Sequence, residues 1–143
     1  MNRRRLEAVL RVRSLQERRA RGELARRTQV HQQAAAAEQH TWEHLDREGD
    51  EAPTGDGLFA MRAVRDAGLR AAERQHRATD DACTEAGAAR CGWTIAARRV
   101  EALDRLGSRL READAAEAER KQILEIDDLV LARRGRGPGG EHA

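Results

Sequence analysis

The sequence predicts an all-α protein: a long antiparallel two-helix coiled-coil hairpin with a longer second helix and a disordered C-terminal tail. Charged residues make up 36% of the chain and aromatic residues only 2%, a composition typical of coiled coils. Apolar residues recur three and four apart, which is the period of one helix face. A segment with proline and three glycines divides this pattern. We therefore expect a hairpin over 1–134 and a disordered tail over 135–143.

The first helix is expected over 3–48. Its apolar stripe is interleaved with polar side chains, so the packing surface is ragged. The stripe contains Leu6, Leu10, Ala20, Leu24, Ala34 and Leu45, with Arg13, Glu17, Arg27, His31, Glu38 and Thr41 between them. Val9, Val12, Leu15 and Val30 fall beside it. Its partner must therefore tolerate polar and small residues.

The turn is expected over 49–57, because Pro53 cannot continue a helix. Gly49 suits the C-terminal cap of the first helix. Thr54 or Asp56 suits the N-cap of the second. A connection this short favours antiparallel neighbours.

The second helix is expected over 58–134, with a more regular stripe than the first. Small residues dominate the middle of the stripe, which predicts a close approach of the two helices, and Trp93 is its one bulky anchor. The stripe contains Leu58, Met61, Arg65, Gly68, Ala72, Gln75, Thr79, Ala82, Ala86, Ala89, Trp93, Ala96, Val100, Leu103, Gly107 and Leu110.

The two helices differ in length, at about 69 Å and about 114 Å with a rise of 1.5 Å per residue. Folded back at the turn, the first helix would cover the second only to about residue 103. The remaining helix carries Ile123, Leu124, Ile126, Leu129, Val130 and Leu131. An apolar cluster without an intramolecular partner typically marks a binding surface.

Charge is distributed unevenly, although the net charge is only +2. Residues 1–30 hold ten arginines against three glutamates, whereas residues 31–60 hold seven acids against Arg47. Cys83 and Cys91 lie about 12 Å apart on one helix and cannot bridge each other, which fits a reducing compartment. No run approaches the ~20 apolar residues of a membrane span, and the arginines at the start are not followed by the apolar run of a signal peptide. We expect a soluble cytoplasmic protein.

Two motifs have plainer explanations than the chemistry they suggest. His40, Glu43 and His44 match the H-x-x-E-H pattern of zinc peptidases, but two helices offer no third ligand or shielded cleft. We interpret the match as chance, with no cofactor. The N-terminal arginines suit phosphate binding, yet aromatic interleaving is almost absent, so we expect no nucleic-acid partner. No catalytic constellation fits this architecture, and we expect a protein that is not an enzyme.

Two stretches together resemble a known family. Near its start the chain carries R-R-L-E-A-V-L-R-V-R-S-L-Q-E-R-R-A-R-G-E-L, and its second helix carries V-E-A-L-D-R-L followed by E-R-K-Q-I-L-E-I-D-D-L. With the size and the central break, these stretches resemble the FliJ family of flagellar type III export proteins over nearly the whole length.

The resemblance implies a coiled-coil stalk or coupling protein, similar to the stalk subunit of rotary ATPases. Its expected partners are the hexameric export ATPase, the cytoplasmic part of the export gate and export chaperones, at the inner-membrane export apparatus in flagellum biogenesis. The residues expected to bind the ATPase are Arg4, Arg11, Arg18, Leu110, Ile123, Leu124, Leu129 and Leu131. Those nearest to the family's gate-binding patch are Trp42, Leu45, Phe59 and Met61, although the match is not residue for residue.

Other functions remain open at this point. The same overhang would suit a homodimeric coiled-coil scaffold that pairs with its own copy, or the equivalent stalk of a virulence injectisome. A basic nucleic-acid-binding coiled coil is the third alternative.

Overall fold

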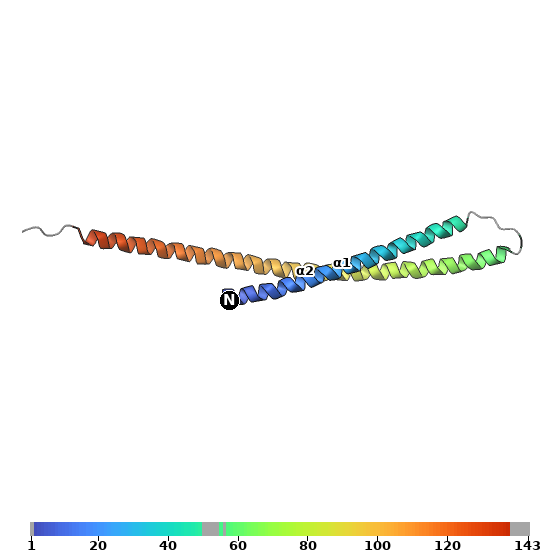
Figure 1. Cartoon of the computed structure of the whole chain (residues 1–143), viewed down its shortest axis with the longest axis horizontal. Coiled ribbons are helices and arrows are strands. Elements are labelled where there is room, and N and C mark those ends of the chain that lie inside the picture. The colour runs from blue at the N-terminus through green and yellow to red at the C-terminus, as the bar shows by residue number, and fades with distance from the viewer. Residues whose placement is uncertain (1, 50–54, 56, 138–143) are drawn as a thin grey trace, which may run out of the picture. The chain divides into compact units, whose positions relative to one another are not determined.

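The computed structural model describes residues 2–49, 55 and 57–137, and these residues form two helices (Figure 1). Helix α1 spans Arg3–Glu48 and helix α2 spans Gly57–Gly135. The described residues contain no strand. The expected fold class is confirmed, and both helices lie within one residue of their expected bounds. The residues expected to form most of the turn (50–54 and 56) and of the disordered tail (138–143) lie outside the described residues.

The chain divides into two compact units, and both helices contribute to each unit. Unit 1 contains Met1–Arg11 and Glu101–Ala143, and unit 2 contains Val12–Val100. In unit 1, Leu6 of α1 lies against Gly107 of α2. In unit 2, Glu17 contacts Trp93 and Glu38 contacts His76. In unit 2 the earlier of the two α1 residues contacts the later of the two α2 residues, so α1 and α2 pair antiparallel there.

The ends of the helices follow from local hydrogen bonding. Asn2 is the N-cap of α1: its carbonyl accepts the first helical hydrogen bonds, from Arg5 N at 2.9 Å and from Leu6 N at 3.1 Å, and its side-chain Oδ1 accepts from Arg4 N at 3.4 Å. Before α2, the Gly55 carbonyl accepts from Leu58 N at 3.1 Å. Gly55 has φ of +74°, a left-handed conformation that glycine adopts without a Cβ penalty. Arg133 and Arg134 occupy the last turn of α2, where cations interact favourably with the helix dipole.

The residues that are shielded from solvent follow the expected stripes closely. Every expected stripe position of α1 is buried or half-buried, and on α2 only Leu58 and Arg65 are exposed. Val9, Val12, Leu15 and Val30 are exposed, in agreement with their expected position beside the stripe. The 3.6-residue period alone therefore identified the packed face of each helix.

The first helix was expected to cover the second only to about residue 103. This expectation was wrong by about two turns, because α1 and α2 pair in a shifted register. In unit 2, Leu45 lies against Gly68. Helix α2 begins eleven residues before Gly68, whereas α1 ends three residues after Leu45. In unit 1, Leu6 correspondingly meets Gly107, and the shielded positions of α2 continue to Leu110 instead of ending near residue 103.

Small residues allow the helices of unit 2 to approach closely. Ala72 is completely buried and Ala82 is 7% exposed. A Cβ atom added to Gly68 would overlap Leu45 Cδ2, so glycine is required for the observed position of that leucine. Among the described residues, the core of unit 2 is therefore built from close backbone approach and contains no large buried side chain.

Polar side chains also connect the helices of unit 2. Trp93 Nε1 donates to Glu17 Oε1 at 2.8 Å, and Arg21 donates to the same oxygen at 2.7 Å. The hydrogen bond from Trp93 is the largest cause of the lowered pKa of Glu17. Trp93 is half-buried, so the expected bulky anchor of the stripe is also a hydrogen-bond donor.

A second polar contact in unit 2 joins His76 of α2 to Glu38 of α1. His76 Nδ1 lies 2.8 Å from Glu38 Oε1, and His76 Nε2 lies 3.5 Å from Asp80 Oδ2. The hydrogen bond with Glu38 and the charges of Asp80 and Glu38 raise the pKa of His76 above 6.5. Hydrogen bonds from His76 and Thr79 lower the pKa of Glu38 below 4.5.

We therefore expect this pair to stabilise the fold most between about pH 4.5 and 6.5. The contribution of His76 is complete below its unfolded pKa and is lost as pH rises through its raised folded pKa. The contribution of Glu38 is present above its unfolded pKa and is lost as pH falls through its lowered folded pKa. Thermal unfolding of His76→Gln between pH 5 and 8 checks the first half, with exposed His40→Gln as the control. If the midpoint of thermal unfolding depended on pH in His76→Gln as it does in the wild type, this expectation would be contradicted.

Candidate partner-binding surfaces

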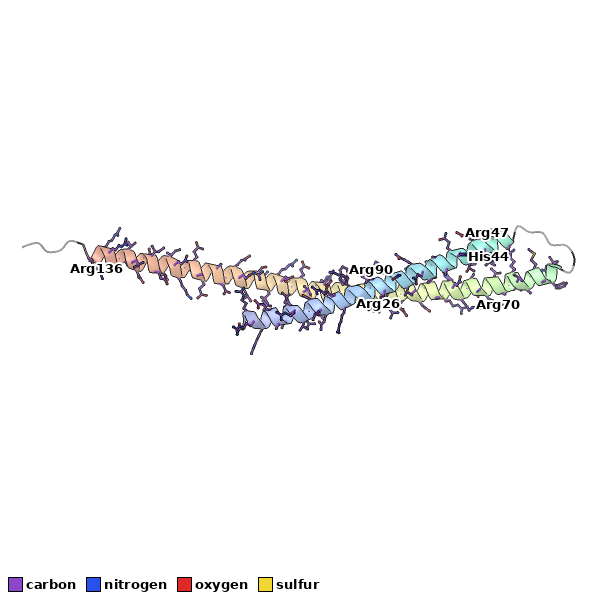
Figure 2. All side chains as sticks on the ribbon, in the orientation of Figure 1. Arg26, His44, Arg47, Arg70, Arg90 and Arg136 are labelled. Carbon is purple, nitrogen blue, oxygen red and sulfur yellow. The ribbon has the colours of Figure 1, made fainter. Side chains whose placement is uncertain are left out.

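The part of α2 that follows the packed stripe is exposed along its whole length. We call residues 111–135 the α2 extension, and each of its residues is exposed. Figure 2 shows side chains above and below the ribbon along this orange-to-red part of α2. The extension carries six large apolar residues with exposed fractions of 44–65%: Ile123, Leu124, Ile126, Leu129, Val130 and Leu131.

These six residues occupy an unusually wide sector of the extension. Ile123, Ile126 and Val130 share one face, Leu124 and Leu131 lie to one side of it, and Leu129 lies to the other. At 3.6 residues per turn the six side chains span roughly 220° of the circumference. A coiled-coil seam with one partner helix uses a narrower stripe. The extension is thus suited to a partner that contacts it from more than one side.

Leu110 differs from the other residues expected to bind the ATPase. It is half-buried and lines a shallow groove in unit 1 with Leu6, Leu10, Leu103 and Gly107. It therefore belongs to the packed stripe, and the uncovered surface begins at Arg111. Ile123, Leu124, Leu129 and Leu131 are exposed as expected.

The expected arginines are exposed on α1. Arg4 and Arg11 lie in unit 1, and Arg18 lies in unit 2. None of these three arginines takes part in an ion pair among the described residues, whereas neighbouring Arg21 pairs with Glu17 at 2.7 Å. Arg4, Arg11 and Arg18 therefore remain available to an acidic partner.

The residues expected to bind the export gate lie around the turn-proximal ends of α1 and α2. Phe59 is 80% exposed and Trp42 is 42% exposed. Leu45 and Met61 are half-buried and line a groove of about 490 Å³, together with Leu58 and Val64. Leu45 also packs against Gly68. The patch is thus an apolar surface in which Phe59 is the most accessible side chain.

The remaining candidate chemistry of the described residues is limited. No group of three or more His, Cys, Asp or Glu side chains within the described parts of the chain is arranged to hold a metal ion. His44 Nε2 instead lies 3.2 Å from Glu48 Oε1. Cys83 and Cys91 are free and exposed. Neither α1 nor α2 contains a stretch apolar enough to cross a membrane.

A second face of α1 carries Leu15, which was not among the expected site residues, beside Arg18, which was. Val12 and Leu15 are 53% and 55% exposed. Leu15 borders a shallow, open recess on the surface of α1 in unit 2, whose lining also includes Arg18, Arg19 and Gly22. The available signal was that Val12 and Leu15 fall beside the packed stripe, among arginines.

These surfaces define a class of protein: a two-helix antiparallel coiled coil whose longer helix presents an uncovered, wide apolar sector. No protein-family model, curated protein sequence or solved structure matches this chain.

Proposed function

We propose that this protein is a coiled-coil stalk of the flagellar type III export apparatus, which binds the hexameric export ATPase through the α2 extension. The observation that carries the proposal is the exposed sector from Ile123 to Leu131. A partner that surrounds the extension, as a ring does, would cover a sector of about 220°, which one helix cannot do. The proposal assigns the protein a binding role without chemistry of its own.

Two further features support this function. The exposed arginines Arg4 and Arg11 are suited to acidic groups of the same partner and would speed its association. The apolar patch around Phe59 is suited to the cytoplasmic part of the export gate. Export chaperones are the third class of partner that we propose.

The test is to mix the full chain with an export ATPase and to measure ATP hydrolysis and ATPase oligomerisation. We expect both to rise with the wild type. Ile123→Asp should raise the protein concentration needed for the same effect by at least about tenfold, because it places a charge in a desolvated apolar contact.

Ile95→Asp is the matched control, since Ile95 and Ile123 are 52% and 53% exposed. Ile95 belongs to unit 2 and lies outside the extension. Equal activity of all three proteins, or no effect of the wild type on the ATPase, would contradict the proposal.

A further inference from the structure

The recess on α1 is shallow and open, and it combines apolar with charged residues: Leu15, Ala20 and Gly22 with Arg18, Arg19, Glu23 and Arg26. Leu15 is 55% exposed, and Gly22, two turns further along the helix, has no side chain. Arg18 and Arg19 are exposed, and no ion pair within the described residues includes either of them. Arg26 (Figure 2), also at the recess, is already paired with Glu23 at 2.7 Å. The two free cations and the exposed leucine are thus the features open to a ligand.

The α2 extension has the complementary chemistry. Residues 112–128 contain seven acids and two bases. Within the described residues of the extension, the single ion pair joins Glu117 to Lys121 at 3.1 Å. The acids outside that pair are Glu112, Asp114, Glu119, Glu125, Asp127 and Asp128.

The two surfaces also match in spacing. On α1, Leu15 is followed by Arg18, Arg19 and Gly22 at three, four and seven residues. On the extension, Leu124 is followed by Asp127, Asp128 and Leu131 at the same intervals. The pattern reads the same in both directions, so it fits parallel or antiparallel contact. In either orientation, Asp127 and Asp128 lie opposite Arg18 and Arg19. A leucine of the extension then lies opposite Gly22.

We propose that the α2 extension of one copy docks on the α1 recess of a second copy. Asp127 and Asp128 would lie against Arg18 and Arg19, with a leucine of the extension over Gly22. The docking itself does not depend on the export function, whereas its competition with an ATPase rests on that proposal. An anionic membrane is the less favoured occupant of the recess, because Val12 and Leu15 offer little apolar area for insertion.

This contact joins two different surfaces of the protein. Each copy therefore carries both the α2 extension, which docks, and the α1 recess, which receives the extension of another copy. It also uses the extension that an ATPase would bind. Self-association and ATPase binding should therefore compete, and a partner that covers the extension should dissociate the assembly of copies.

The experiment is sedimentation velocity of the full chain at increasing concentration, at about 50 mM and about 500 mM salt. We expect concentration-dependent association that weakens with salt. The double variants Arg18→Glu/Arg19→Glu and Asp127→Lys/Asp128→Lys should each weaken association by about tenfold or more. The matched control is Arg98→Glu/Arg99→Glu, because these adjacent arginines are also exposed on a helix.

Mixing the two double variants at equal concentration is the decisive measurement. Their altered charges are complementary between chains, so the mixture should associate as strongly as the wild type. A wild type that stays monomeric at about 200 µM and low salt would overturn the proposal. A mixture that fails to associate would also overturn it. The same holds if the Arg98→Glu/Arg99→Glu control weakens self-association as much as the two double variants do. Binding of Arg18 and Arg19 to anionic phosphatidylserine vesicles without self-association would identify a membrane as the occupant instead.

Discussion

Ala72→Leu is expected to destabilise the protein by about 3 kcal/mol, the largest effect that we expect from a single small-to-large substitution. Ala72 is completely buried in unit 2, one turn from Gly68 and from Gln75. Gln75 accepts a hydrogen bond from Thr41 of α1. Leucine would therefore force the helices apart and would break this hydrogen bond. Leucine and alanine have similar helix propensities, so the loss would come from packing.

Urea unfolding followed by circular dichroism measures this loss. Ala88→Leu is the control, because Ala88 is exposed on the same helix and should change stability by no more than about 0.5 kcal/mol. Equal free energies of unfolding for Ala72→Leu and Ala88→Leu would contradict a close approach of the helices at Ala72.

Leu6→Ala is expected to cost about 3 kcal/mol, with its effect concentrated in unit 1. Leu6 is 5% exposed, and no other large apolar side chain among the described residues is buried. It fills the space over Gly107, beside Leu103 and Leu110. With no other large buried side chain in the described part of unit 1, α1 should fray at its N-terminus when this contact is removed.

Hydrogen exchange resolved along the chain tests this expectation. Amides of residues 5–11 should exchange much faster in Leu6→Ala, whereas those of unit 2 should change little. The same substitution at Leu106, which is 36% exposed, provides the control. Unchanged protection of residues 5–11 in Leu6→Ala would show that another contact holds this part of α1.

The candidate surfaces differ in how far they could be predicted from the sequence. The cluster from Ile123 to Leu131 was predicted, because six large apolar residues within nine positions stand out in a charged helix. The α1 recess was not, although Arg18 was expected to bind a partner, because the exposure of Leu15 beside it is known only from the structure. Leu110 has the same apolar character as Leu124, and only its place in the groove with Leu6 separates the two.

By itself the sequence determined the helical fold class, the helix bounds and the face that each helix buries. These properties depend on neighbours within three or four positions, through the helix period, and on breakers such as Pro53. The tertiary structure alone decided the register, which places Leu45 at Gly68 and Leu6 at Gly107. Register depends on how side chains far apart in the chain fit together, and a ragged stripe is compatible with more than one alignment. That fit ends the packed stripe at Leu110 and fixes where the uncovered extension begins.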